Sequence, residues 1–186
     1  MFVLVENDSI TKTLNTSRGI TIGENQYPRA IYSSWSTAER EAIGIYEVVF
    51  DNTNTKDEGY YTNTNQSFNF ADGKVTASFG APTARPLDDV TENDIVIPGL
   101  KTQHKKTIKQ QASGYLTPTD WNVIKATEVE SYSVPADMTT YRAAVRTASN
   151  DMEVLIDACT TVDELAALYA YTEEGTRPLG EWPEEV

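Results

Sequence analysis

The sequence is poor in the two residue types that most often build disulfides and metal sites. Its 186 residues include one cysteine, Cys159, and one histidine, His104. A lone cysteine excludes an intramolecular disulfide, and a lone histidine excludes sites that need two imidazole ligands, which removes most zinc chemistry. We therefore predict no metal site, no cofactor and no catalytic residue. Both residues lie at helical spacing among apolar neighbours, so we expect Cys159 in the core and His104 in a packed or interface position.

Positive charge and long apolar runs are also scarce. The chain has 15 Lys and Arg against 28 Asp and Glu, a formal net charge of −13. Such a surface repels phosphate backbones and anionic membranes. No apolar run approaches the roughly 20 residues that a membrane-spanning helix needs. We therefore expect a soluble chain whose partners are neither nucleic acids nor membranes.

The composition changes along the chain near Pro98. The first part is rich in Thr, Asn, Ser, Gly, Tyr and Phe, whereas the second favours Ala, Leu, Lys and Glu at helical spacing. We predict an α+β protein with three parts: a β-rich domain with one short helix (1–98), a small helical domain (99–173) and an extended acidic tail (174–186).

Local signals define elements in the first part. Asp72 and Gly73 can occupy the two positive-φ positions of a two-residue hairpin turn, which predicts that Phe70 pairs with Val75. The segment 36–39 reads as a capping box that begins the short helix.

The second part contains several segments with helical spacing, over residues 100–115, 137–150, 151–159 and 161–171. In the second of these, Arg142 and Arg146 share a stripe that we expect to face away from the apolar seam. Lys101, Lys105 and Lys109 form a stripe that predicts either a solvated face or a dock for carboxylates of this chain or a partner.

The stretch "LTPTDWNVIK" (116–125) resembles the start of a helix. Thr117 fits the N-cap, Pro118 fits the first helical position, and Asp120 suits the positive end of the helix dipole. Leu116 can pack against Trp121 across the cap, as in a hydrophobic staple. We therefore expect Trp121 to be buried, in one cluster with Tyr141.

The acidic tail has too few apolar residues to fold alone, yet it carries Leu179 and Trp182. Together with Tyr171 they are candidate partner-binding residues, with Trp182 as the anchor. The alternative is that Trp182 folds back onto the helices of its own chain.

The stretch "LTPTDWNVIKATEVESYSVPADMTTYRAAVR" resembles the core of phage tail assembly chaperones of the tail-fibre-assembly type. In that pattern a basic helix leads into Leu-x-x-Thr-Asp-Trp, a proline turn and a Tyr-Arg-x-x-hydrophobic-Arg helix. The matching residues are Leu116, Thr119, Asp120, Trp121, Pro135, Tyr141, Arg142, Val145 and Arg146. The resemblance covers about residues 99–171, and "NQYPRAIYSSWSTAEREAIGIYEV" looks like a region that accompanies such domains in some marine phage proteins. Unlike the shortest members, this chain continues through two further helices and an acidic tail.

The resemblance implies a non-enzymatic protein that binds a phage tail or tail-fibre protein, located in the host cytoplasm during assembly and, if it is retained, in the virion tail. It implies fold and interface roles for the matching residues, and self-association stays open. An alternative is a permanent virion subunit, such as a tail adaptor or host-recognition element. A third is a hydrolase that uses a divalent metal on clustered acids, namely Asp88, Asp89, Glu92 and Asp94, although this segment lacks EF-hand spacing and is more typical of a solvated loop. A mostly exposed Trp121, or a sheet after Gly99, would remove the basis for the resemblance.

Overall fold

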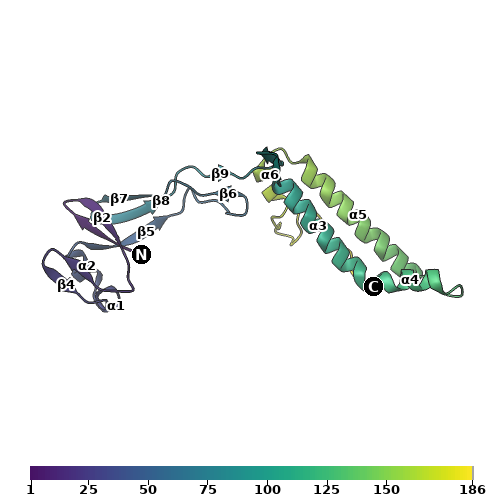
Figure 1. The fold of residues 1–186 in the computed structure, drawn as a ribbon, viewed down its shortest axis with the longest axis horizontal. Helices are drawn as coiled ribbons and strands as arrows, with labels where there is room; N and C mark the ends of the chain where they lie inside the picture. The colour runs from purple at the N-terminus through teal and green to yellow at the C-terminus, as the bar shows by residue number, and fades with distance from the viewer. Residues whose placement is uncertain (186) are drawn as a thin grey trace. The chain divides into compact units, whose positions relative to one another are not determined.

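A computed structural model describes residues 1–185, and its contacts divide the chain into two compact units, residues 1–83 and residue 84 onward. The amino-terminal unit consists mainly of strands, and the helical unit contains the long helices (Figure 1). This confirms the predicted α+β class. The division falls within β9 (Thr83–Ala84), which pairs with β6 (Tyr61–Thr62), whereas the change in composition indicated a later position, at Pro98.

The amino-terminal unit is built on a five-stranded sheet with the order β2-β1-β5-β8-β7. Its strands are β1 (Phe2–Glu6), β2 (Ser9–Leu14), β5 (Ile45–Asp51), β7 (Ser67–Ala71) and β8 (Lys74–Ser78). Neighbouring strands are antiparallel except β5 and β8, which are parallel. The edge strands β2 and β7 contact each other, so the sheet curls and its two edges come together.

The β7–β8 hairpin has the register that the sequence predicts. Phe70 pairs with Val75, and the turn residues Asp72 and Gly73 have φ values of 51° and 71°. Two positive φ values are what a type I′ turn requires. The prediction from these local residues is therefore confirmed.

Because side chains alternate along a strand, β1 contributes to an apolar cluster on each face of the sheet. One cluster contains Phe2, Leu4, Leu14, Ile20, Ile31 and Ile45. The other contains Val3, Val5, Val48, Val75 and Ala77. The first cluster draws on α1 (Ile31–Ser34) and on the small hairpin of β3 (Ile20–Ile22) and β4 (Asn25–Tyr27). Helix α2 (Thr37–Glu41) packs beside β5 and begins with the predicted capping box, which is confirmed.

The helical unit is organised by two long helices that lie side by side and run antiparallel (Figure 1). Its helical elements are α3 (Leu100–Leu116), η1 (Thr117–Thr119), α4 (Asp120–Glu128), α5 (Ala136–Ala158) and α6 (Val162–Ala167). The segments predicted as helical over 137–150 and 151–159 form one continuous helix, α5, because no glycine or proline interrupts them. No helix in the described part of the chain is long and apolar enough to span a bilayer.

The lysine stripe of α3 contacts carboxylates of its own chain. Lys105 Nζ lies 2.6 Å from Asp157, and Lys109 Nζ lies 3.1 Å from Glu153, both on α5. Lys101 Nζ lies 3.0 Å from Asp88. The sequence left open whether this stripe is a solvated face or contacts carboxylates of this chain or a partner. The structure shows contacts with this chain's own carboxylates.

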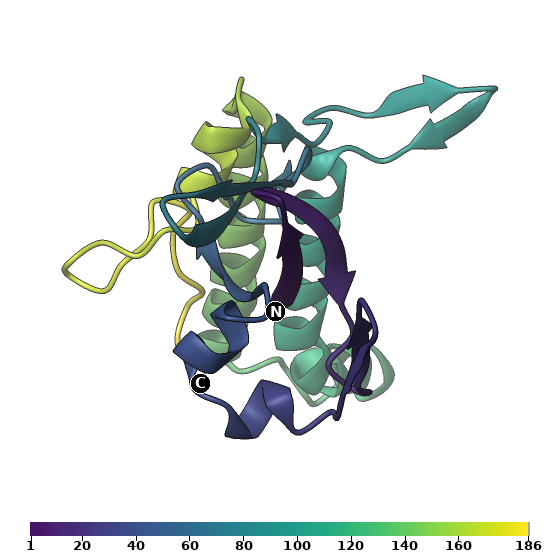
Figure 2. The ribbon, with the colours of Figure 1, turned by 90° about the vertical axis from the view of Figure 1, so that its left-hand side faces the viewer.

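A hairpin of β10 (Val90–Glu92) and β11 (Ile95–Ile97) precedes α3 and projects from the helices of its unit (Figure 2). Its base is bonded to the first turn of α3, where the Leu100 amide donates to the Pro86 carbonyl at 2.9 Å. These bonds explain why the hairpin groups with the helices and why the unit begins before Gly99.

Candidate protein-binding surface

Arg142, on α5, joins the residues that carry the sequence pattern. Its guanidinium donates to the Leu116 carbonyl at 2.9 Å, to the Thr119 hydroxyl, and to the Asp120 carboxylate at 2.7 Å. The side chain is buried, so its charge needs these acceptors to offset its loss of water. The prediction that Arg142 faces away from the apolar seam is therefore wrong. Arg146 does lie outside, with one nitrogen donating to the Arg142 carbonyl.

The chain enters α4 without the predicted N-cap. Residues 116–120 are already in the right-handed helical region, so α3 passes through η1 into α4 without a break that would free amides for capping. The Thr117 and Thr119 hydroxyls instead donate back to the Ser113 and Leu116 carbonyls, each at 2.7 Å. The N-cap role of Thr117 is thus wrong, whereas Asp120 lies in the first turn of α4 as expected.

Trp121 is 56% exposed, and the prediction that it is buried with Tyr141 is wrong. The neighbouring Asn122 takes the inward position on α4, and about 100° of rotation per residue turns Trp121 outward. Tyr141 is buried with Ala112 and Val145, and Leu116 and Trp182, not Trp121, pack against this cluster.

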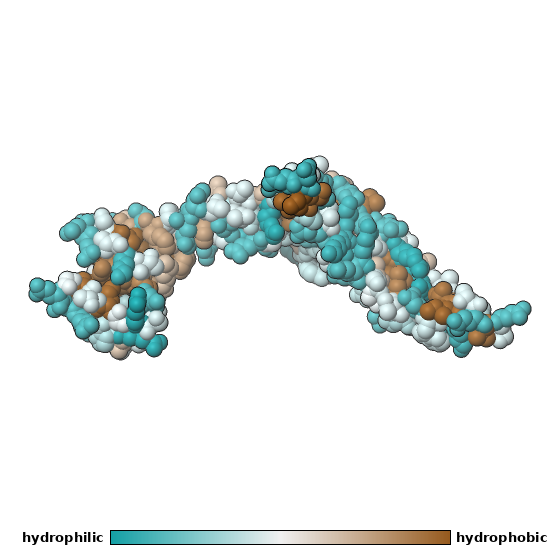
Figure 3. All heavy atoms as spheres, in the orientation of Figure 1, coloured by the Kyte–Doolittle hydropathy of each residue, from teal (hydrophilic) through white to brown (hydrophobic). Residues whose placement is uncertain are grey.

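The outward side of α4 carries Trp121 and Ile124, and the segment that follows the helix carries Val129 and Tyr132. We call these four residues the α4 surface. The Trp121 and Tyr132 rings stack with centroids 6.5 Å apart, and Lys125 Nζ lies 4.2 Å from the Tyr132 ring centre. The Tyr132 hydroxyl donates to Asn122 at 2.5 Å, which fixes the aromatic pair to the inner side of the helix. Hydrophobic atoms are visible over this end of the helical unit (Figure 3). Exposed apolar groups of this kind mark interaction sites.

The sequence alone missed most of the α4 surface. Trp121, Ile124, Lys125 and Glu128 fall at positions i, i+3, i+4 and i+7, a helical face that could have been recognised. Its exposure could not be recognised, because the predicted start at Thr117 led us to place Trp121 in the core.

The tail folds back onto the helices, which is the alternative that the sequence left open. Trp182 packs against Tyr115 with ring centroids 5.2 Å apart, and its indole N–H donates to Gln111 at 3.3 Å. Leu179 is buried, and its amide donates to the Leu168 carbonyl at 3.0 Å. Of the three candidate partner-binding residues, Tyr171 alone stays largely exposed. The tail is thus a strap on the helical unit in this structure.

The lone histidine and cysteine lie in apolar surroundings. His104 packs against the Tyr169 ring at 4.8 Å, and burial lowers its pKa. Cys159 is in the core, as predicted, and burial raises the pKa of its thiol, which disfavours the reactive thiolate.

The clustered acids are dispersed by the fold. Asp88 pairs with Lys101, and Asp89 accepts from the Gly99 amide at 2.9 Å, whereas Glu92 and Asp94 lie on the β10–β11 hairpin. Across residues 1–185, no group of three or more His, Cys, Asp or Glu side chains is arranged to hold a metal ion.

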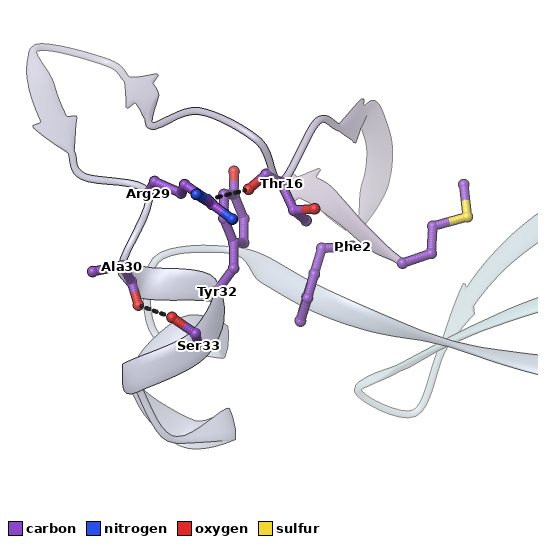
Figure 4. A pocket seen from close by; sticks show the side chains of 7 residues that line it. Phe2, Thr16, Arg29, Ala30, Tyr32 and Ser33 are labelled. Carbon is purple, nitrogen blue, oxygen red and sulfur yellow. Dashed lines mark hydrogen bonds between the residues drawn. The ribbon is translucent and has the colours of Figure 1, made fainter.

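A hollow of about 640 Å³ lies in the amino-terminal unit (Figure 4). Its polar groups bond to neighbouring backbone: Arg29 donates to the Thr16 carbonyl and Ser33 to the Ala30 carbonyl, both at 3.3 Å. Phe2 and Tyr32 form its aromatic wall, with ring centroids 5.5 Å apart. The hollow is open, and Arg29 and Ser33 already bond to neighbouring backbone, so we place the candidate protein-binding site on the α4 surface.

Comparison of this chain with protein-family models, with curated proteins and with solved structures finds no match.

Proposed function

We propose that the chain is a non-enzymatic bacteriophage tail or tail-fibre assembly chaperone or accessory protein, which binds a tail or fibre protein in the host cytoplasm through the α4 surface. The observation that carries the proposal is the group of contacts around Arg142. Residues that match the pattern in separate parts of the sequence, at 116–120 and 142, meet there through direct hydrogen bonds. The pattern thus acts as a structural unit that holds one end of α4.

The α4 surface is suited to binding a protein because it is held before binding. Arg142 fixes the first turn of α4 through Asp120, and the Tyr132–Asn122 hydrogen bond ties the following loop to the helix. An aromatic pair held in this way loses little conformational freedom on association. Tryptophan and tyrosine are also the residues that most often dominate the free energy of binding at interfaces.

Trp121 is exposed and the expected cluster with Tyr141 does not form, which is the outcome that removes the basis given for the resemblance. The proposal therefore depends on the contacts around Arg142. The resemblance also implied interface roles for the matching residues, and the outward position of Trp121 suits that role. The proposal accordingly assigns Trp121 to the interface and leaves Tyr141 and Arg142 in the fold.

The test is affinity purification of the tagged full chain from phage-producing cells, with bound proteins identified by mass spectrometry. We expect a tail or fibre protein to copurify, and Trp121→Ala to weaken its capture about thirtyfold, the equivalent of about 2 kcal/mol for an aromatic anchor. Val154→Ala is the matched control, because Val154 is 66% exposed on α5, away from α4. Recovery of no tail or fibre protein, or equal capture by both variants, would contradict the proposal.

The alternative of a permanent virion subunit differs from an assembly chaperone only in how long the chain stays on the particle. Mass spectrometry of purified virions separates the two. A stoichiometric amount of the chain in mature particles identifies a retained subunit, and its presence only in assembly intermediates identifies a transient chaperone.

A further inference from the structure

The β10–β11 hairpin is a preorganised ribbon whose role the proposed function does not include. Its strands pair Val90 with Ile97 and Glu92 with Ile95. The turn residues Asn93 and Asp94 have φ values of 50° and 64°, both in the left-handed region that a type I′ turn requires. The sequence signal was present, since two β-branched runs flank an Asn-Asp pair, but the acidic residues led us to expect a loop.

The ribbon is fixed firmly at its base. The Gly99 amide donates to the Asp89 carboxylate at 2.9 Å, and the Lys101 amide donates to the Leu87 carbonyl at 3.0 Å. A Cβ on Gly99 would lie 2.3 Å from the backbone of Asp88, so the close approach of the two segments requires glycine. The ribbon therefore projects from the start of α3 in a defined direction.

The ribbon is apolar and uncovered within its own unit. Ile95 is 66% exposed and Val96 is 59% exposed, and Val90 and Ile97 are also exposed. Hydrophobic atoms lie beside the hydrophilic tip of the hairpin (Figure 3), and Figure 2 shows it standing clear of the helices. An isolated two-stranded hairpin is marginally stable in water. A covering partner would both bury these side chains and stabilise the ribbon.

The edge of β11 is chemically suited to adding to another sheet. Both strands are edge strands, because the sheet has two strands. Natural edges are usually protected by a charge or a proline within the strand. Residues 95–97 have neither, so shortness is the only such protection within β11 itself, and an exposed edge of β-branched residues is the kind of edge to which a partner strand can add.

The charge of the ribbon defines the partner. Residues 87–98 include no lysine or arginine. Asp88 and Asp89 are engaged at the base, which leaves Glu92 and Asp94 exposed at the tip. A second copy of the chain would bring the same carboxylates and a net charge of −13, which disfavours self-pairing. We propose that the ribbon is a docking arm that adds to an open sheet edge of a partner protein in which lysine or arginine flanks an apolar strand.

The test uses the full chain and two synthetic nine-residue peptides with the same alternating valine and threonine strand, one flanked by lysines and the other by glutamates. Nuclear magnetic resonance follows the backbone amides of residues 90–97. We expect the lysine-flanked peptide to shift these amides, and to bind about tenfold more tightly than the glutamate-flanked peptide, a preference that salt reduces. Val96→Lys should abolish the shifts, whereas the matched Val154→Lys on α5 should retain them.

Other results would overturn the proposal. These are an absence of shifts at millimolar peptide, equal binding of the two peptides, or shifts that survive Val96→Lys. Sedimentation of the full chain tests self-association. A dimer that Val96→Lys dissociates would show that a second copy covers the ribbon, and would overturn the proposal. Trp121 lies outside the ribbon, so the two tests are independent. Failure of the peptide test leaves the proposed function standing, and failure of the capture test leaves the docking arm standing.

Discussion

The two units bury their apolar residues to different extents. In the amino-terminal unit, the sheet has a cluster on each face and its edge strands come together, so the large exposed apolar residues are few: Met1, Val49 and Phe50. In the helical unit, they are more numerous: Val90, Ile95, Val96, Ile97, Trp121, Val123, Ile124, Val129, Val154, Leu155 and Tyr171. This difference is the reason why the proposal places partner binding on the helical unit.

The cause of this difference lies in how each element is covered. A curled sheet can enclose one cluster by itself, whereas two paired helices cover only the faces they turn to each other. The tail adds a third element over Ala112, Tyr115 and Tyr141. Most of the exposed apolar residues of the helical unit belong to the α4 surface or to the β10–β11 hairpin, and Val123, Val154, Leu155 and Tyr171 belong to neither.

The largest expected effect is the difference in unfolding free energy between substitutions at a buried and at an exposed isoleucine of the helical unit. Ile156 is fully buried, and Ile156→Ala should lower the free energy of unfolding by about 2 to 5 kcal/mol. The matched variant Ile124→Ala, at a position 56% exposed, should change it by less than about 0.5 kcal/mol. Urea unfolding of the full chain, monitored by hydrogen exchange in the helical unit, would measure both changes in unfolding free energy. Similar losses in the two variants would show that the α4 surface belongs to the core.

The next largest effect is expected when the contact between the tail and the helices is removed. Trp182→Ala removes a half-buried indole and its hydrogen bond to Gln111, so we expect a loss of about 2 kcal/mol in unfolding free energy. Hydrogen exchange should increase in α3 and α5 and stay unchanged in the β5–β8 strands. Tyr171→Ala, at an exposed aromatic residue that precedes the tail, is the control and should leave stability nearly unchanged. An unchanged melting temperature for Trp182→Ala would refute the strap.

A smaller effect is expected at the Arg142 contacts. Asp120→Asn keeps an acceptor but removes the charge that faces a buried guanidinium, and the Asp120 side chain is half exposed, so we expect a loss of about 1 kcal/mol. Asp151→Asn, an exposed position on α5, is the matched control. Equal melting temperatures for the two variants would show that the ion pair contributes nothing to the start of α4.

The smallest expected effect is a pH dependence confined to the helical unit. Burial lowers the pKa of His104 below its ordinary value of 6.5, so the unfolded chain takes up this proton at a higher pH than the folded one. Protonation of His104 therefore does not lower the free energy of unfolding well above pH 6.5, and lowers it increasingly as the pH falls below 6.5. His104→Gln should remove this part of the dependence, as measured by hydrogen exchange at pH 7 and pH 5.5. An equal decline in both proteins would contradict the assignment.

The sequence predicted the features that short segments determine. The Asp72-Gly73 turn sets the register of β7–β8, and the capping box at Ser36 begins α2. Each depends on residues within a few positions of one another, so the pattern alone carries the information.

The positions of Trp121 and Arg142 could not be predicted in this way. The outward turn of Trp121 depends on the continuity of α3, η1 and α4, which shifts the helical phase from that of a helix starting at Thr117. The burial of Arg142 depends on a carbonyl 26 residues earlier in the chain, which becomes an acceptor only when α5 packs beside α3. Both are consequences of tertiary packing, which overrides local propensity.

The central proposal is that the α4 surface, and not the tail, binds the partner. Its most direct test is a paired measurement on Trp121→Ala and Trp182→Ala, which compares capture of the copurifying tail or fibre protein with the melting temperature of the isolated chain. We predict that Trp121→Ala weakens capture about thirtyfold while melting is unchanged, and that Trp182→Ala lowers the melting temperature while capture below that temperature is retained. Loss of capture in Trp182→Ala alone, with melting unchanged, would contradict the account.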